Sequence, residues 1–255
     1  MTIRAWAVLL CVAVTTAVAH EIAIVDVADQ WTQIAAVGPS LDAIGLPYDD
    51  LTADVEGGSF TLSGHALLIV GSMATYNAAV HQGLDDNAQV IQDFVDGGGV
   101  VIESTQEADQ HQANVDWLPA GLVAVRTDPD LPEFTIEQPG HPLFNDPNAM
   151  TDAEFVGWRY NHWPTVWEVF ATLDGFDILA TSSGRSVIGE AEFGRGMFVM
   201  MSMAPDKYSQ VGNDDNTKEM ATLFFENMIT TYFLSVTDVS PEGLVTTTWG
   251  DLRLR

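Results

Sequence analysis

The sequence predicts an α/β fold built around a mostly parallel β-sheet, and three features carry that prediction. Segments over residues 21–107 follow the order strand, helix, strand, strand, helix, strand. Residues 100–102 are an uninterrupted apolar run, typical of a strand buried on both faces of a parallel sheet. An apolar stripe at helical spacing in residues 90–95 and a break at Gly97–Gly99 precede that run. Because ligands gather beyond the carboxyl ends of such strands, residues 103–105 occupy the expected place for a site.

The first half of the chain supplies the other elements of this sheet. Residues 21–27 alternate and then run apolar, which predicts the first strand. Residues 31–44 have helical spacing, but Gly38-Pro39 interrupts it, so a kinked or split helix is expected. The remaining segments are a short strand after residue 45, acidic turns over 49–63, a buried strand over 65–71 and a polar loop over 72–81.

The second half predicts a late β-hairpin and a closing helix. Residues 186–193 and 197–203 are the two strands of the hairpin, joined by Gly194-Arg195-Gly196. Residues 216–232 form the helix and carry one apolar face. The other expected features are a polar loop over 108–119, short strands over 122–125, 134–136 and 178–181, a rigid turn around His141, an aromatic-rich segment over 158–167, and a tail from residue 234.

The N-terminus predicts export from the cytoplasm. Arg4 precedes an apolar run over residues 5–14, which is too short to span a bilayer comfortably, and Ala17-Val18-Ala19 fits the signal-peptidase rule. We therefore expect a signal peptide over 1–19, an α/β domain over 20–233, a tail over 234–255, a secreted or periplasmic location and no stable membrane anchor. Cys11, the only cysteine, would leave with the signal peptide, which removes disulfides and thiol chemistry from the mature chain.

The charge balance limits the partners. Nine Lys and Arg residues against 36 Asp and Glu give a formal net charge of −27. Such a chain repels phosphate backbones, so a nucleic-acid partner is not expected. The acidic surface is typical of a protein kept soluble by its charge, including in a salty environment. The sequence predicts no oligomeric state and no cofactor.

Four stretches together resemble the class I glutamine amidotransferase-like superfamily, in particular its secreted, ThuA-like branch. They are the first strand IAIVD (22–26), ALLIVGS (66–72), VIQDFVDGGGVVIES (90–104) and SVIGEAEFGRGMFVMMSMAPD (186–206). The resemblance covers roughly residues 21–233 and implies a flavodoxin-like three-layer sandwich. Glutaminases of that family place a nucleophilic cysteine in the turn after a central strand, backed by histidine and glutamate. Here Glu103-Ser104-Thr105 occupies the corresponding turn, so glutaminase activity is not expected. With the predicted signal peptide, this leads us to expect an exported, non-catalytic binding or accessory domain that acts in carbohydrate or envelope metabolism.

The same turn also allows a hydrolase as the alternative. Ser104 beside Glu103 would be the nucleophile, and His111, oriented by Glu107 or Asp109, would activate it. The neighbours of Ser104 are not the small residues that a tight nucleophile elbow needs, so a polar residue that ends a strand is the simpler interpretation. Glu107, Asp109, His111 and Asp116 could instead hold a metal, although a solvated acidic loop explains them better, and no metal site is assigned.

The aromatic-rich segment carries the remaining hypothesis. Trp158, Tyr160 and Trp163 could stack on sugar rings, while Arg159 and His162 would hydrogen-bond hydroxyl groups. The alternative is that these rings, with Trp167, cover the sheet as part of the core. The ligand predicted from this segment is a glycan or another small molecule. We expect residues 213–216 to cap the final helix rather than bind calcium.

Overall fold

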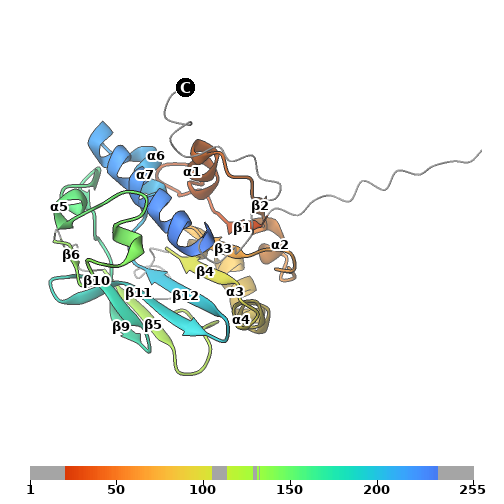
Figure 1. Cartoon of the computed structure of the whole chain (residues 1–255). Coiled ribbons are helices and arrows are strands. Elements are labelled where there is room, and N and C mark those ends of the chain that lie inside the picture. The colour runs from red at the N-terminus through yellow and green to blue at the C-terminus, as the bar shows by residue number, and fades with distance from the viewer. Residues whose placement is uncertain (1–20, 105–113, 129–130, 132, 235–255) are drawn as a thin grey trace, which may run out of the picture.

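The computed structural model of the protein describes residues 21–104, 114–128, 131 and 133–234. The predicted signal peptide and the residues after 234 lie outside this part, as do Thr105, Glu107, Asp109 and His111. The described chain is a mixed α/β structure with helices and a small second sheet packed against a large central sheet (Figure 1). In this part of the chain, no helix combines the length and apolar character needed to span a bilayer.

The central sheet has the strand order β2-β1-β3-β4-β12-β11-β10-β6. The first five strands pair in parallel, and the last three add to them in antiparallel fashion. The strands are β1 (Ile22–Val25), β2 (Asp49–Asp50), β3 (Leu67–Val70), β4 (Val100–Glu103), β6 (Thr135–Ile136), β10 (Asp177–Ser182), β11 (Arg185–Phe193) and β12 (Gly196–Met201).

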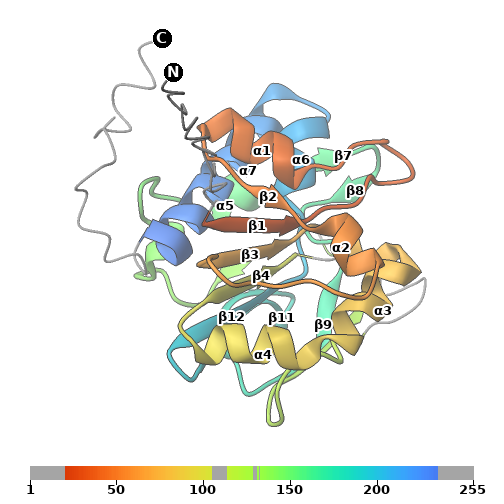
Figure 2. The same ribbon diagram turned by 90° about the vertical axis from the view of Figure 1, so that its right-hand side faces the viewer.

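Helices cover both faces of this sheet. One face carries α1 (Val37–Ile44), α6 (Pro205–Val211), α7 (Asp215–Ile229) and the short α5 (Asp152–Phe155). The other face carries α2 (Thr52–Glu56), α3 (Ala78–Asp86), α4 (Ala88–Asp96) and the two-stranded sheet of β5 (Val123–Thr127) and β9 (Val169–Asp174). Figure 2 shows α1, α6 and α7 on one side of the strands and α3 and α4 on the other. The layers are therefore those of an α/β sandwich.

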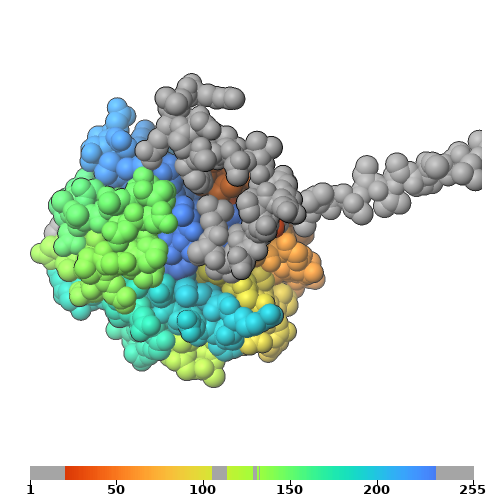
Figure 3. Space-filling view, viewed as in Figure 1, coloured from red at the N-terminus to blue at the C-terminus, as the bar shows by residue number. Residues whose placement is uncertain are grey.

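Smaller elements fill the connections. They are η1 (Ala74–Tyr76), η2 (Pro142–Phe144), the hairpin of β7 (Arg159–Tyr160) and β8 (Trp163–Pro164), and η3 (Thr230–Leu234), a π-helical end of α7. In the space-filling view the green segment before β7 and the cyan β11–β12 hairpin flank the blue C-terminal helix (Figure 3).

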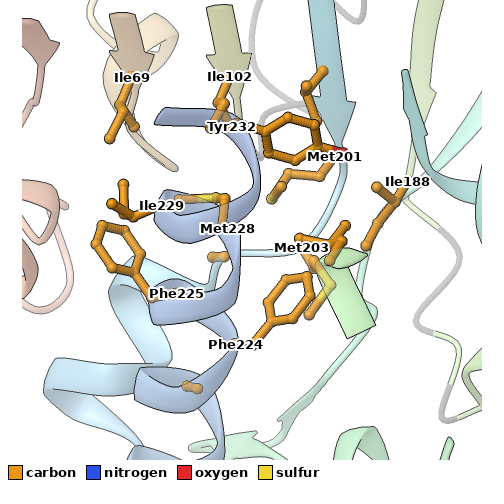
Figure 4. Packing of buried hydrophobic residues seen from close by; sticks show 14 of the residues in the cluster. Ile69, Ile102, Ile188, Met201, Met203, Phe224, Phe225, Met228, Ile229 and Tyr232 are labelled. Carbon is orange, nitrogen blue, oxygen red and sulfur yellow. The ribbon is translucent and has the colours of Figure 1, made fainter. Parts of the chain in front are cut away.

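The core between α7 and the sheet follows from the alternation of side chains along the strands. Ile69 and Ile102 point from β3 and β4 toward Phe225 and Ile229 of α7, and Met203 lies beside Phe224 (Figure 4). The intervening Leu68 and Val101 point to the opposite core, under α2, α3 and α4. Each central strand is apolar throughout because both of its faces are buried.

The unit expected at residues 85–107 is confirmed over its described part. In α4, Ile91 and Val95 are buried, and β4 lies between β3 and β12 with all four residues buried. Gly98 has φ of +108°, the left-handed region that glycine tolerates. At Gly99, a Cβ would lie 2.3 Å from the ring of Phe94, so a larger residue here would have to displace that ring.

Two helix predictions need correction. Residues 31–36 are not helical, and α1 begins at Val37, so there is no split helix. Pro39 lies in the first turn of α1, where its missing N–H costs nothing and no kink arises. The turns expected over 49–63 contain α2, and the loop expected over 72–81 contains η1 and the first turn of α3. These helices are short and weakly apolar and so give little periodic signal.

The late elements were predicted well. The β11–β12 hairpin turns at Gly194-Arg195, and α7 begins one residue before the expected start. The Asp214 side chain accepts a hydrogen bond from the backbone N–H of Thr217, which is the capping role expected there. The strand β9 was not predicted, because Trp167 and Phe170 continue the aromatic segment without a turn signal.

Candidate functional site

The carboxyl ends of the parallel strands carry a group of buried charged residues. Asp26 follows β1, Ser72 follows β3, and Asp206 and Lys207 begin α6 after β12. Parallel strands end at the same edge, which is where open α/β sheets bind ligands. We call Asp26, Asp29, Glu168, Asp206 and Lys207 the buried charged network, because each is at most 8% exposed.

Lys207 is the single cation of this network. Its ammonium group forms an ion pair with Asp29, and both side chains are 2% exposed. The other carboxylate oxygen of Asp29 accepts a hydrogen bond of 2.6 Å from the backbone N–H of Trp31, which fixes the acid in the loop after β1. Burial lowers the pKa of Lys207, and the carboxylates of Asp29, Asp206 and Glu168 partly oppose that shift.

Asp26 and Asp206 flank the Gly71-Ser72 turn after β3. The backbone N–H of Ser72 donates to Asp206 at 3.0 Å, and the backbone N–H groups of Ala36 and Gly38 donate to Asp26 at 3.2 and 3.1 Å. Burial, followed by the negative charge of Asp206, raises the pKa of Asp26 to about 7. Burial also raises the pKa of Asp206. The pKa values of both carboxyl groups are therefore raised, which favours the protonated form of Asp26 and of Asp206.

Gly71 makes this arrangement possible. A Cβ at that position would lie 2.8 Å from Val37 and 3.0 Å from the Asp26 carboxylate. The start of α1 could not then approach β3, and the N–H groups that bind Asp26 would move away. Gly71, in the ALLIVGS stretch, is therefore needed for the close packing of α1 against β3 at the site.

Aromatic side chains from three separate segments cover the network. We call Trp31, Tyr76, Tyr160, His162 and Trp163 the aromatic face. Ring centroids lie 5.9 Å apart for Trp31 and Trp163, 5.7 Å for Trp31 and Tyr76, and 5.6 Å for the stacked pair of Tyr160 and Trp163. In Figure 2 the β7–β8 hairpin and the loop after β1 lie together at this end of the sheet.

Lys207 lies beneath the aromatic face and makes cation–π contacts with three of its rings and with the buried Trp167. The ammonium nitrogen lies 4.4 Å from the ring centroid of Trp167 and between 5.2 and 5.8 Å from those of Trp31, Tyr160 and Trp163. The side of the aromatic face that points away from Lys207 reaches solvent, since Trp31 is 46% exposed and His162 is also exposed. The rings therefore have one side fixed by the charged network and another available for contact.

The residues of the predicted ligand-binding segment, 158–163, lie in two different environments. Tyr160, His162 and Trp163 belong to the aromatic face. Trp158 is fully buried, and its indole N–H donates to the carbonyl of Glu154 at 2.7 Å, which assigns it to the core. Arg159 is half-buried and donates to the carbonyl of Trp158. The core alternative therefore holds for Trp158, whereas Tyr160, His162 and Trp163 reach the surface and their role in ligand binding stays a prediction.

The predicted catalytic residues lie deeper than a reactive group normally does. Ser104 is 3% exposed, and its hydroxyl donates to the carbonyl of Val70 at 3.3 Å. Glu103 is 1% exposed and forms a 2.9 Å ion pair with Arg126 of β5, itself buried. Their proposed partner His111 lies outside the described residues, so the catalytic assignment stays a prediction.

No metal site appears in the described part of the chain. There, no group of three or more His, Cys, Asp or Glu side chains has the arrangement needed to hold a metal ion. Asp116 is exposed, while its proposed companions Glu107, Asp109 and His111 lie outside that part.

Sequence reasoning missed the charged network itself. Asp26 and Asp29 were recognised only as the end of the first strand, and Lys207 was not singled out. One signal was present: Lys207 is one of only two lysines in the chain, and it lies six residues after the apolar strand β12. A cation that is rare in so acidic a chain is a reasonable candidate for a specific partner.

Comparison with known proteins defines the fold and not the activity. No protein-family model matches the sequence, and neither does any curated protein. A cytoplasmic protein of Salmonella typhimurium LT2 shares the fold, with 14% identity, coverage of 76% of this chain and 84% of that chain, and a TM-score of 0.52.

Two enzymes are also structurally similar. A β-galactosidase from Rahnella sp. R3 has 17% identity, coverage of 84% of this chain and 31% of that chain, and a TM-score of 0.48. An exo-β-1,4-mannosidase from Opitutaceae bacterium strain TAV5 has 12% identity, coverage of 82% and 36%, and a TM-score of 0.48. The chain thus spans about a third of the length of these two enzymes.

The protonated Asp26 predicts a specific pH dependence of stability. Its pKa rises from 3.8 to about 7 in the folded state, so the folded protein holds a proton that the unfolded chain releases. This contribution is complete below pH 3.8 and is lost as the pH rises through 7, a change of about 4 kcal/mol at most. Urea unfolding of wild type and Asp26→Asn from pH 4 to 8 should show a smaller decline for the variant.

The control for this experiment is Asp174→Asn, at an exposed position at the end of β9. This variant removes one negative charge, as Asp26→Asn does, but it should keep the full decline of the free energy of unfolding with rising pH. If the curves of Asp26→Asn and Asp174→Asn run parallel, Asp26 does not hold the proton.

Proposed function

We propose that this protein is an exported, non-catalytic binding domain of the glutamine amidotransferase-like, ThuA-like type, and that it binds a glycan at the aromatic face. The observation that carries the proposal is the convergence of Trp31, Tyr160 and Trp163 at the carboxyl ends of the parallel strands. The order β2-β1-β3-β4-β12 in the parallel half supports a flavodoxin-like arrangement. The absence of cysteine after residue 11 supports a domain without the family's nucleophile.

A glycan fits the chemistry of this face. The C–H faces of sugar rings pack on aromatic rings, and sugar hydroxyl groups need polar side chains at the edge. His162 and Asn161 are exposed beside Trp163, and Gln30 bonds to the Tyr76 hydroxyl next to Trp31. The face therefore combines apolar area with donors and acceptors.

The hairpin that presents the rings is held in one conformation. Asn161 has φ of +51°, and its backbone N–H donates to the Asn213 side chain at 2.9 Å. The Asn213 amide in turn donates to the Asn161 carbonyl at 3.0 Å. Such a fixed turn reduces the entropy that binding would cost.

The test is calorimetric titration with a panel of soluble oligosaccharides and polysaccharides. Trp31→Ala should weaken binding of a positive glycan at least tenfold and lower stability much less than loss of a core tryptophan would, because nearly half of Trp31 is exposed. Trp163→Ala should weaken it as well. The control Val156→Ala removes another exposed apolar side chain, 55% exposed, and should bind normally. Binding that is absent throughout the panel, or that is unchanged in Trp31→Ala, would remove the glycan from the proposal.

A hydrolase is the second candidate, and one observation favours it. A carboxyl group with a pKa of about 7 is well matched to general acid–base catalysis at neutral pH, and Asp26 has that value at the ligand edge of the sheet. Ser104 and the residues 107–111 remain the sequence-based alternatives for the reacting group. Incubation with chromogenic glycosides and esters tests this candidate: turnover that Asp26→Asn or Ser104→Ala abolishes supports it, and no turnover by wild type excludes it.

Export is a separate part of the proposal. A signal peptide over 1–19 predicts that the mature protein begins at His20 in a secreted or periplasmic fraction. N-terminal sequencing of protein from fractionated cells tests this directly. A cytoplasmic protein that starts at Met1 would contradict it.

A further inference from the structure

A cavity lies at the end of the sheet opposite the aromatic face. Its volume is about 470 Å³, within the range of small-molecule sites. Val100 at the start of β4, Met197 at the start of β12 and Tyr232 of η3 line it, together with the turn that carries His141. Strand β12 begins at this cavity, and the chain reaches Lys207 beyond its other end, so the two places are separated by the length of the strand.

A hydrogen-bonded network of three side chains forms part of the lining. The Tyr232 hydroxyl donates to one carboxylate oxygen of Glu190 at 2.7 Å, and Nε2 of His141 lies 3.1 Å from the other. Nδ1 of His141 accepts from the backbone N–H of Leu143 at 3.2 Å, which leaves the ring proton on Nε2, facing Glu190. Burial raises the pKa of Glu190, but the bonds from His141 and Tyr232 outweigh it and the pKa lies below its ordinary value.

The charges around the cavity are mainly negative. Glu190, Glu192 and Asp146 line it with one opposing guanidinium, that of Arg195. The Arg195 side chain donates to the carbonyl of Gly97 at 2.7 Å, at the end of α4, so one of its N–H groups is already used and the guanidinium is held at the edge of the cavity. The net charge of −27 on the whole chain adds to the attraction for a cation.

Thr230, whose side chain carries a buried polar atom, lines the cavity together with apolar residues. Among the described residues, the buried hydroxyl oxygen of Thr230 has no hydrogen-bond partner, although a buried polar atom normally has one. Val100, Pro142 and Met197 supply apolar surface between the polar groups. A ligand that suits both features has a hydrogen-bond donor at one end and a short hydrocarbon body.

We propose that this cavity binds a small organic ammonium ion, with the charged group between Glu190 and Thr230 and the hydrocarbon part against Met197 and Tyr232. The ammonium supplies up to three donors, which a carboxylate and a hydroxyl oxygen accept. The bonds from His141 and Tyr232 keep the Glu190 carboxylate ionised and in place. This site is independent of the glycan proposed for the aromatic face.

Butylamine and 1,4-diaminobutane, titrated calorimetrically into the full-length mature protein, are the probes. 1-Butanol and butyrate are the matched neutral and anionic compounds. Butylamine should bind at least tenfold more tightly than butanol or butyrate, and its affinity should fall with added salt. Equal affinity for butylamine and butanol would overturn the proposal.

Variants locate the binding. Glu190→Gln should weaken butylamine binding about tenfold, and Glu192→Gln, at an exposed position of β11, should weaken it about threefold without affecting the fold. The control Glu219→Gln lies on an exposed part of α7 outside the cavity and should bind like wild type. Wild-type affinity in both Glu190→Gln and Glu192→Gln would overturn the proposal. Loss of binding in Trp31→Ala would also overturn it, by placing the amine at the aromatic face.

Discussion

Replacing Lys207 with methionine is expected to lower the free energy of unfolding by about 3–5 kcal/mol, the typical cost of leaving buried charges without their partner. Lys207 is the only cation in a network that holds Asp29, Asp206 and Glu168, all at most 3% exposed. Methionine matches the volume of lysine, so the loss measures charge rather than a cavity. Urea unfolding followed by circular dichroism measures the change.

Two further variants make this result specific. Lys218→Met removes the other lysine, which is half-buried on α7, and should change stability by less than about 1 kcal/mol. In the double variant Lys207→Met with Asp29→Asn, part of the stability should return, because the acid that faced the lysine is now neutral. Equal stability of Lys207→Met and Lys218→Met would show that the ion pair does not support the fold.

Replacing Arg126 with methionine is expected to have a similar effect, again about 3–5 kcal/mol. The guanidinium lies 2.9 Å from Glu103, and both side chains are at most 3% exposed. Glu103 is the last residue of β4, in the centre of the sheet, so its carboxylate cannot reach water when the partner is removed. Thermal and urea unfolding of the variant measure the loss.

The corresponding control is Arg185→Met, at the exposed start of β11, which should be almost neutral. Arg126→Met combined with Glu103→Gln should recover much of the lost stability, because no buried charge then lacks a partner. If the double variant is no more stable than Arg126→Met alone, the effect comes from lost packing around Phe170, over whose ring the guanidinium lies.

The sheet was predictable where the pattern is local. Residues 90–102 combine a helical stripe, glycines and an apolar strand, and each signal depends only on neighbouring residues. The β11–β12 hairpin was predictable for the same reason. Helices α2 and α3 were not, since their short apolar faces become meaningful only when they pack against β1, β3 and the rest of that core.

The sequence predicted where the candidate site lies in the fold, but not which residues form it. The sequence indicated the carboxyl ends of the strands, and the structure has its buried charged network there. The residues singled out were Glu103 and Ser104, whose polar groups are used inside the fold by Arg126 and Val70. A strand end identifies an edge, but the partner of each side chain comes from another part of the chain.

By itself the sequence determined the apolar strands, the glycine break before β4, the late hairpin and the excess of negative charge. The tertiary structure alone decided that Lys207 meets Asp29 beneath Trp31 and Trp163, and that Trp158 lies in the core while Trp163 reaches the surface. The reason is physical. Periodicity reports which residues prefer burial, but the contacts of a buried charge or an aromatic ring depend on which distant segments the fold brings to the same edge of the sheet.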